Sequence, residues 1–169
     1  MSHDQLHPEL LLLLVREGRI SEFVRQAEDL DPADLADVLA AANEDERVEI
    51  VKLLPPSLSG QALWEMPEQE HAEETLAALE PEEAAGIVGE LPDDDAADLL
   101  GELEPQEQQR ILSKVEDVEQ RAEVQDLLQY DPESAGGLMT AQLVSVQADH
   151  TVGLALDEIR RQADEVEDF

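Results

Sequence analysis

Proline recurs along this chain at nearly constant intervals, and this spacing restricts the possible fold more than any other feature. One series follows every 24 to 27 residues: Pro32, Pro56, Pro81, Pro105 and Pro132. A second series of breaks falls between them: Asn43, Pro67, Pro92 and, less clearly, Val118. Proline suits the first turn of a helix, because its φ is already helical and its missing N–H has no partner to lose there. Each break is therefore predicted to begin a helix of about ten residues.

The segments between the breaks carry the apolar period of a helix. Leu35, Val38, Leu39 and Ala42 stand at positions i, i+3, i+4 and i+7, and the same spacing recurs in 84–91 and 96–103. Helices this short do not persist alone in water, so each must bury its apolar stripe against its neighbours. The pattern predicts an all-α superhelical array of about ten short helices over residues 8–129, built from a two-helix repeat of ~24 residues.

Several residues have the character of helix caps. Asp31 is expected to cap the helix that begins at Pro32, and Asn43 with Glu46 resembles a capping box. Ser21 is expected to cap an earlier helix, and Gly18 to close the helix before it.

The pattern changes after Tyr130. Residues 131–140 contain too much glycine for a long helix, Leu143–Val146 is predicted to form a short strand, and residues 152–159 return to helical spacing. A single strand followed by a single helix cannot bury its own apolar side chains. We therefore divide the chain into a helical domain, 1–130, and the incomplete beginning of a second domain, 131–169.

Charge and composition exclude several classes of function. The chain has 43 Asp+Glu against 10 Lys+Arg, a net charge of -33 and no cysteine. Such a surface repels nucleic acid and anionic lipid but attracts cations, and thiolate chemistry is absent. Catalytic motifs such as Gly-x-Ser-x-Gly or His-Glu-x-x-His are missing, so no enzyme is predicted. The longest apolar run, Leu10–Val15, is too short for a membrane span, and the chain is expected to be soluble.

The sharpest candidate for a cation site follows Pro92. Asp94 and Asp98 are four residues apart, so on a helix their carboxylates share one face, with Asp93 and Asp95 beside them. An alternative interpretation is that these acidic residues only favour the positive end of a helix dipole.

Other polar clusters carry weaker signals. The acidic runs 44–46, 68–74 and 80–83 are interpreted mainly as solvated helix starts. His3 and His7 lie near the N-terminus, and His71 and His150 have no partner pattern in the sequence. Trp64 and Met66 are interpreted as packing residues.

The segment Tyr130–Thr140, with its Ser-Ala-Gly-Gly-Leu-Met-Thr run, resembles the junction between the N-terminal domain and the first CBS domain in the MgtE family of magnesium transporters. Residues 143–161 are similar to the opening strand and helix of a CBS module, and the upstream repeats are similar to that family's superhelical domain. The resemblance implies a magnesium-sensing region on the cytoplasmic side of the membrane, belonging to a homodimeric transporter. It also implies that Mg²⁺ binds between acidic domain faces and stabilises the closed pore, with Asp94 and Asp98 in the position of its magnesium-binding residues.

Two further hypotheses remain open. Short stacked helices also occur in scaffold and protein-interaction domains, such as the middle domain of the flagellar motor switch protein FliG. The acidity is alternatively an adaptation to high salt, in which excess carboxylates maintain solvation without any specific site.

Overall fold

The computed structural model describes residues 8–131, 134–136, 139 and 145–162. Over residues 8–127 it consists of ten α-helices and one short 3₁₀ helix, η1 (Glu68–Glu70). The α-helices are α1 (Pro8–Arg16), α2 (Ile20–Ala27), α3 (Pro32–Ala41), α4 (Glu44–Leu53), α5 (Pro56–Trp64), α6 (Ala72–Ala77), α7 (Pro81–Val88), α8 (Asp93–Gly101), α9 (Pro105–Leu112) and α10 (Val118–Leu127). The predicted all-α array of about ten short helices is confirmed.

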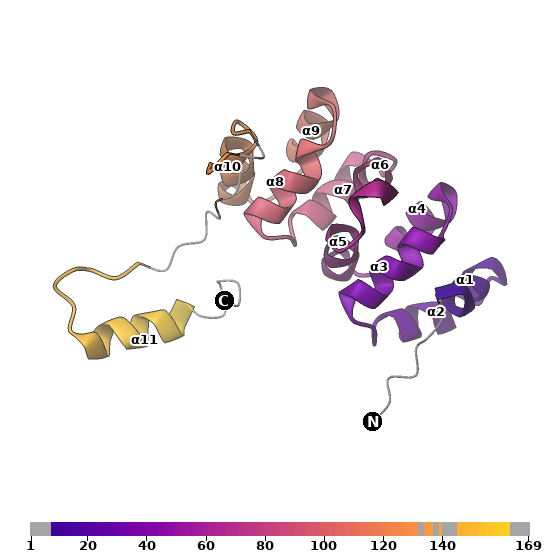
Figure 1. The fold of residues 1–169 in the computed structure, drawn as a ribbon, viewed down its shortest axis with the longest axis horizontal. Helices are drawn as coiled ribbons and strands as arrows, with labels where there is room; N and C mark the ends of the chain where they lie inside the picture. The colour runs from indigo at the N-terminus through magenta and orange to yellow at the C-terminus, as the bar shows by residue number, and fades with distance from the viewer. Residues whose placement is uncertain (1–7, 132–133, 137–138, 140–144, 163–169) are drawn as a thin grey trace.

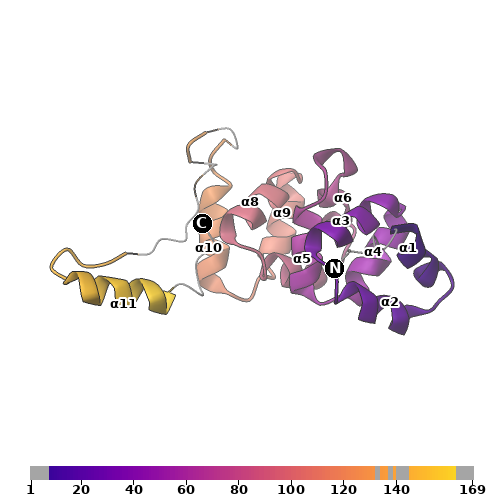
Figure 2. The same cartoon turned by 60° about the horizontal axis from the view of Figure 1, so that its bottom comes forward.

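From α3 onwards each helix packs mainly on a helix two positions along the chain, which divides the superhelix into two rows, whereas α2 packs mainly on α1. Helices α1, α3, α5, α7 and α9 form one row, and α4, α6, α8 and α10 form the other (Figures 1 and 2). One repeat of about 24 residues therefore adds one helix to each row. The apolar stripes merge into one aliphatic core that runs along the superhelix, with Phe23 as its fully buried aromatic side chain.

Most predicted helix ends agree with the structure. Asp31 caps α3 by accepting from the N–H of Ala33, and Asn43 forms a complete capping box with Glu46 at α4. Gly18 closes α1 with φ +72°, a left-handed conformation that glycine adopts without strain. The prediction for Ser21 is wrong, because α2 begins at Ile20 with Arg19 at the N-cap position, so Ser21 lies within its first turn.

Pro67 begins the 3₁₀ helix η1 rather than an α-helix. The α-helical path resumes only at Ala72, after His71 adopts a left-handed conformation with φ 52°. Periodic breaks predict where the chain interrupts a helix, but they do not distinguish an α start from a 3₁₀ turn. Met66 is buried as expected, whereas Trp64 at the end of α5 is largely exposed.

Polar side chains connect successive repeats by donating to the carbonyl groups that helix ends leave without partners. Arg47 of α4 is buried and donates to the carbonyls of Leu39 and Glu70. Arg110 of α9 donates to the carbonyl of Leu79 at 3.0 Å, and Gln120 of α10 donates to that of Leu91 at 2.9 Å. These bonds fix the rotation of each helix pair against the one before it.

The C-terminal segment differs from the superhelix. The predicted strand at 143–146 is not formed in its described part, since Ser145 and Val146 lie outside any strand, and residues 143 and 144 lie outside the described residues. A strand requires a hydrogen-bonding partner, and none of the described residues provides one. The predicted helix is present as α11 (Val152–Gln162), which lies apart from the superhelix (Figure 1).

Candidate metal-binding site

Helix α8 carries the four aspartates that the sequence selects. It begins directly after Pro92, which lies at the N-cap position and provides no side-chain cap, so Asp93, Asp94 and Asp95 occupy the first turn. Within the described part of the chain, no lysine or arginine forms an ion pair with Asp93, Asp94 or Asp98. Asp93, Asp94 and Asp98 therefore concentrate negative charge on α8 that no basic side chain of the described residues pairs with.

The structure separates Asp93 from the other three. Its side chain is turned into the packing between α8 and α10, and only 7% of the residue is exposed. Burial raises the pKa of Asp93 to about 7, helped by a side-chain hydrogen bond with Glu123 and by the charges of Glu123, Asp94 and Asp117. The raised pKa means that the buried Asp93 carboxyl holds its proton more tightly than a solvated aspartate does, because ionising it beside other carboxylates carries a cost.

Asp94 and Asp98 lie on the same face of α8, four residues apart, as the spacing predicts. Asp98 is exposed, and partial desolvation together with the charges of Asp94 and Glu102 raises its pKa. Asp94 is half-buried, and no donor among the described residues reaches its buried Oδ1 atom. Asp95 is also half-buried.

These observations fit a hard divalent cation. Mg²⁺ takes oxygen ligands, keeps several waters and needs only one or two carboxylates from a protein surface. Asp94 and Asp98 would hold such an ion, because one has an oxygen without a protein donor and the other faces solvent beside it. Asp93 is hydrogen-bonded to Glu123 and is the least accessible of the four.

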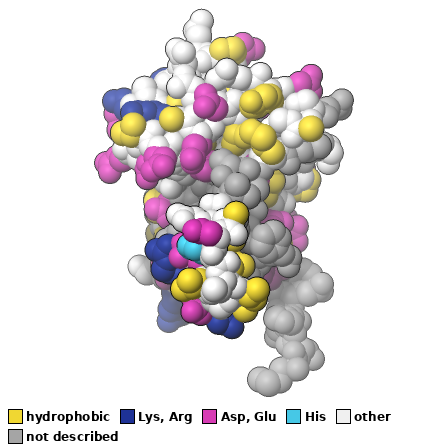
Figure 3. Space-filling view, turned by 90° about the vertical axis from the view of Figure 1, so that its left-hand side faces the viewer, with side chains coloured by type: hydrophobic (Ala, Val, Ile, Leu, Met, Phe, Trp, Pro, Cys, Tyr) yellow, Lys and Arg dark blue, Asp and Glu magenta, His cyan; other side chains and the backbone are white. Residues whose placement is uncertain are grey.

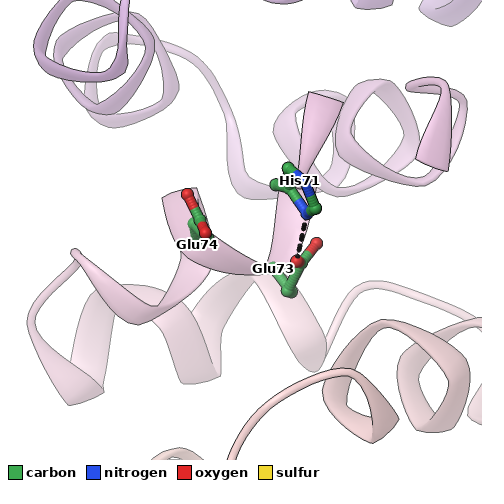
Figure 4. Close-up of side chains that lie close together, drawn as sticks. All are labelled: His71, Glu73 and Glu74. Carbon is green, nitrogen blue, oxygen red and sulfur yellow. Dashed lines mark hydrogen bonds and ion pairs between the residues drawn. The ribbon is translucent and has the colours of Figure 1, made fainter. Parts of the chain in front are cut away.

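Sequence reasoning missed a cluster of three side chains that could ligate a metal ion. His71, Glu73 and Glu74 place one potential ligand atom each within 4.8 Å of one another, and Nδ1 of His71 lies 3.0 Å from Oε1 of Glu73 (Figure 4). The Glu73 carboxylate raises the pKa of His71, first by this hydrogen bond and then by its charge. The signal in the sequence was the acidic run around His71, which was interpreted as solvated. His3 and His7 lie outside the described residues.

The end of the molecule where α10 and α11 lie presents a mixed surface (Figure 3). Apolar side chains of α11 are exposed there, with Val152 at 77% and Leu154 at 56%. Arg160 and Arg161 lie in the last turn of the same helix. In the described part of the chain, no helix is long and apolar enough to cross a bilayer.

The stack of two-helix repeats defines the chain as a helical-repeat domain, with its acidic candidate site on the surface of one helix. The sequence model of the MgtE intracellular N domain matches residues 30–133, and the chain belongs to the MgtE family. This assignment confirms the family resemblance, while the resemblance of residues 143–161 to a CBS module stays a prediction. The family is one of transport proteins and not of enzymes.

Two solved structures are similar over nearly the whole chain. One, described as the soluble part of a magnesium transporter, is 28% identical, with a TM-score of 0.76 over 95% of this chain. The other, described as the cytosolic domain of the Mg²⁺ channel MgtE in complex with ATP, is 31% identical, with a TM-score of 0.80 over 94% of this chain. The chain spans 63% and 64% of those two proteins. No curated protein sequence matches the chain significantly.

Proposed function

We propose that this chain is the magnesium-sensing regulatory region of a magnesium transporter or channel, located on the cytoplasmic side of the membrane. In this proposal Mg²⁺ binds to Asp94 and Asp98, with Asp95 and Asp93 contributing charge, and the ion joins α8 to an acidic face of the domain that follows. The bound ion stabilises the closed pore of a homodimer.

The main support for the proposal is that two α8 carboxylates have no basic partner among the described residues. Asp98 is exposed and repelled by Asp94 and Glu102, while Oδ1 of Asp94 has no donor among the described residues. A helix start that used its carboxylates only as caps would bond them to its own N–H groups, as Asp31 and Asp117 do. Membership of the MgtE family and the magnesium-related descriptions of both similar structures support Mg²⁺ as the ion.

In this proposal ion binding and domain closure are coupled, because two acidic faces repel each other unless a cation binds between them. Without a cation the α8 face and an acidic partner face separate, and a divalent ion between them reverses the sign of the interaction. We assign residues 1–130 to the sensing domain and 131–169 to the junction and the beginning of a CBS domain. The partner face is then provided by the rest of the same protein.

Protease protection of the cytosolic region in the full-length transporter, titrated with Mg²⁺, tests this function. We expect Asp94→Ala with Asp98→Ala to shift protection to higher Mg²⁺ concentration, because two direct ligands are lost. The matched control is Asp45→Ala with Glu49→Ala, which removes the same charge from an exposed i, i+4 pair on α4.

The two double variants differ in position and not in net charge. If their protection curves coincide with each other, Mg²⁺ acts by general screening and the proposed ligands are wrong. If neither curve differs from the unmodified protein and no Mg²⁺ protection is seen at all, the domain is a helical scaffold without metal sensing.

A further inference from the structure

A groove of about 310 Å³ runs along α7. Asp94 and Asp98, the ligands proposed above for Mg²⁺, do not line it, although Asp117, whose charge acts on Asp93, does. One wall is α7 and the turn after it, and the other is the segment 114–117 that leads into α10. Gln120 of α10 holds the two walls together by donating to the carbonyl of Leu91 just after α7. We call this feature the α7 groove.

The floor of the α7 groove is apolar and its rim is acidic. The small or aliphatic residues that line the groove, named here its floor, are Ala85, Gly86, Gly89 and Val115, of which Ala85 and Val115 are buried. The rim carries exposed carboxylates at Glu82 in the first turn of α7, at Glu90 just after its end, and at Glu116 on the opposite wall. Negative groups are therefore spaced along an apolar channel that follows a helix of eight residues, about 12 Å long.

The chain itself places one alkylammonium group at this rim. Nζ of Lys114 lies 2.6 Å from Oε1 of Glu82, and Lys114 holds the pKa of Glu82 below its usual range. The rim thus accommodates an ammonium group on a methylene chain, while Glu90 and Glu116 form no ion pair among the described residues.

We propose that the α7 groove binds linear aliphatic polyamines. Such molecules carry ammonium groups separated by methylene segments, and an extended triamine has a length comparable to that of α7. The methylenes would lie over the glycine floor while the ammonium groups meet Glu82, Glu90 and Glu116. A hydrated Mg²⁺ ion has no apolar part and would gain nothing from the floor. The inference is independent of the proposed magnesium sensing.

Diffuse attraction to a chain of charge -33 is the competing explanation for any polycation binding. Gly86 provides a test that leaves charge unchanged, because a Cβ added there meets no atom within 4 Å. Gly86→Leu therefore adds a branched apolar side chain at a groove-lining position with no clash at its Cβ, and leucine also favours the helix more than glycine does.

The experiment measures spermidine binding to the full chain by titration calorimetry at near-physiological ionic strength, where diffuse attraction is screened. We expect Gly86→Leu to weaken binding by about tenfold or more, because the leucine occupies the floor. We expect Lys114→Gln to strengthen binding, because it removes the ammonium group that competes for Glu82.

Each variant has a matched control on the same molecule. Ala33→Leu adds the same side chain to an exposed position of α3, and Lys52→Gln removes the ammonium group that pairs with Glu83 at 2.9 Å outside the groove. Both controls should bind spermidine like the unmodified chain. Equal binding by Gly86→Leu and the unmodified chain, equal gains from Lys114→Gln and Lys52→Gln, or no measurable spermidine binding would each overturn the proposal.

Discussion

The first four helices and the helices α8 to α10 are built from the same repeat, but they differ in the charged side chains that meet between their helices. Residues 8–53 contain five basic and twelve acidic residues, and residues 93–127 contain three and twelve. In the first region Arg16 and Glu46 form a two-bond ion pair between α1 and α4, with distances of 2.7 and 3.0 Å. In the second region, Asp93 and Glu123 place two carboxyl groups against each other between α8 and α10.

This difference shows that one packing scheme tolerates both attraction and repulsion between its rows. The aliphatic core continues through both regions, with Leu39 and Leu100 each fully buried. The N-terminal region uses its basic residues to stabilise helix packing, whereas the α8 region retains uncompensated negative charge. The two regions should consequently respond to pH in opposite directions.

The largest expected effect concerns Arg47 in the N-terminal region. Arg47→Met preserves much of the side-chain volume but removes a donor from the carbonyls of Leu39 and Glu70, of which that of Leu39 keeps only the N–H of Ala42. We expect the free energy of unfolding to fall by about 3 kcal/mol, measured by urea denaturation. Arg25→Met removes the same charge from an exposed position of α2 and should cost less than about 0.5 kcal/mol. Equal losses in both variants would show that Arg47 contributes only its charge.

The next effect concerns Asp93 in the α8 region. Its folded pKa of about 7 exceeds the ordinary value of 3.8, so the folded state binds the proton more tightly than the unfolded chain does. The associated stability is complete below about pH 4 and is lost as the pH rises to about 7. Asp93→Asn removes this dependence and should be more stable than the unmodified chain above pH 7, by about 1–3 kcal/mol.

The prediction is checked by measuring the thermal unfolding of the unmodified chain and of Asp93→Asn from about pH 4 to above pH 7. The net charge of the chain affects both proteins nearly equally. The difference between their stabilities at each pH therefore reports the contribution of Asp93. Parallel stability curves would mean that the Asp93 carboxyl is solvated and does not hold its proton more tightly than an ordinary aspartate.

A smaller effect separates the N-caps of α4 and α10. Asn43→Ala removes the capping box and should cost about 1 kcal/mol. Asp117→Ala also removes a cap, one that accepts from the N–H groups of Glu119 and Gln120, but it relieves repulsion with Asp93 as well. We expect the second substitution to cost less than the first in urea denaturation at neutral pH. If Asp117→Ala costs more stability than Asn43→Ala, the charge of Asp117 does not repel that of Asp93 measurably.

The smallest effect concerns acid and the Arg16–Glu46 pair. The hydrogen bond from Arg16 lowers the pKa of Glu46 to about 2 from its usual value of 4.5. The stability from this pair is therefore present above about pH 4.5 and is lost as the pH falls towards 2, opposite in sign to the Asp93 effect. Glu46→Gln should flatten this part of the acid dependence in a pH series of thermal unfolding curves. An unchanged slope in the variant would assign the acid sensitivity to other carboxylates.

The difference between the two regions was only partly predictable from the sequence. Proline spacing and apolar period predicted the helices, and the caps at Asp31 and Asn43 followed from residues within three positions of each other. The position of Asp94 and Asp98 one turn apart on a helix also followed from the sequence, whereas their role as magnesium ligands stays a prediction. The burial of Asp93 was not predicted, because its partner Glu123 is thirty residues away and belongs to another repeat. His71 and Glu73 were missed because their contact depends on a left-handed turn after η1.

The sequence by itself determined the number, length and approximate limits of the helices, since helix formation depends on propensities, caps and periodicity within about ten residues. It also determined the acidic character of the chain and its family. Only the tertiary structure decided which side chains meet across repeats: Arg16 with Glu46, Asp93 with Glu123, and Lys114 with Glu82 over the α7 groove. The physical reason is that the rotation and spacing of stacked helices arise from packing the whole apolar core, and small changes in rotation select different polar neighbours.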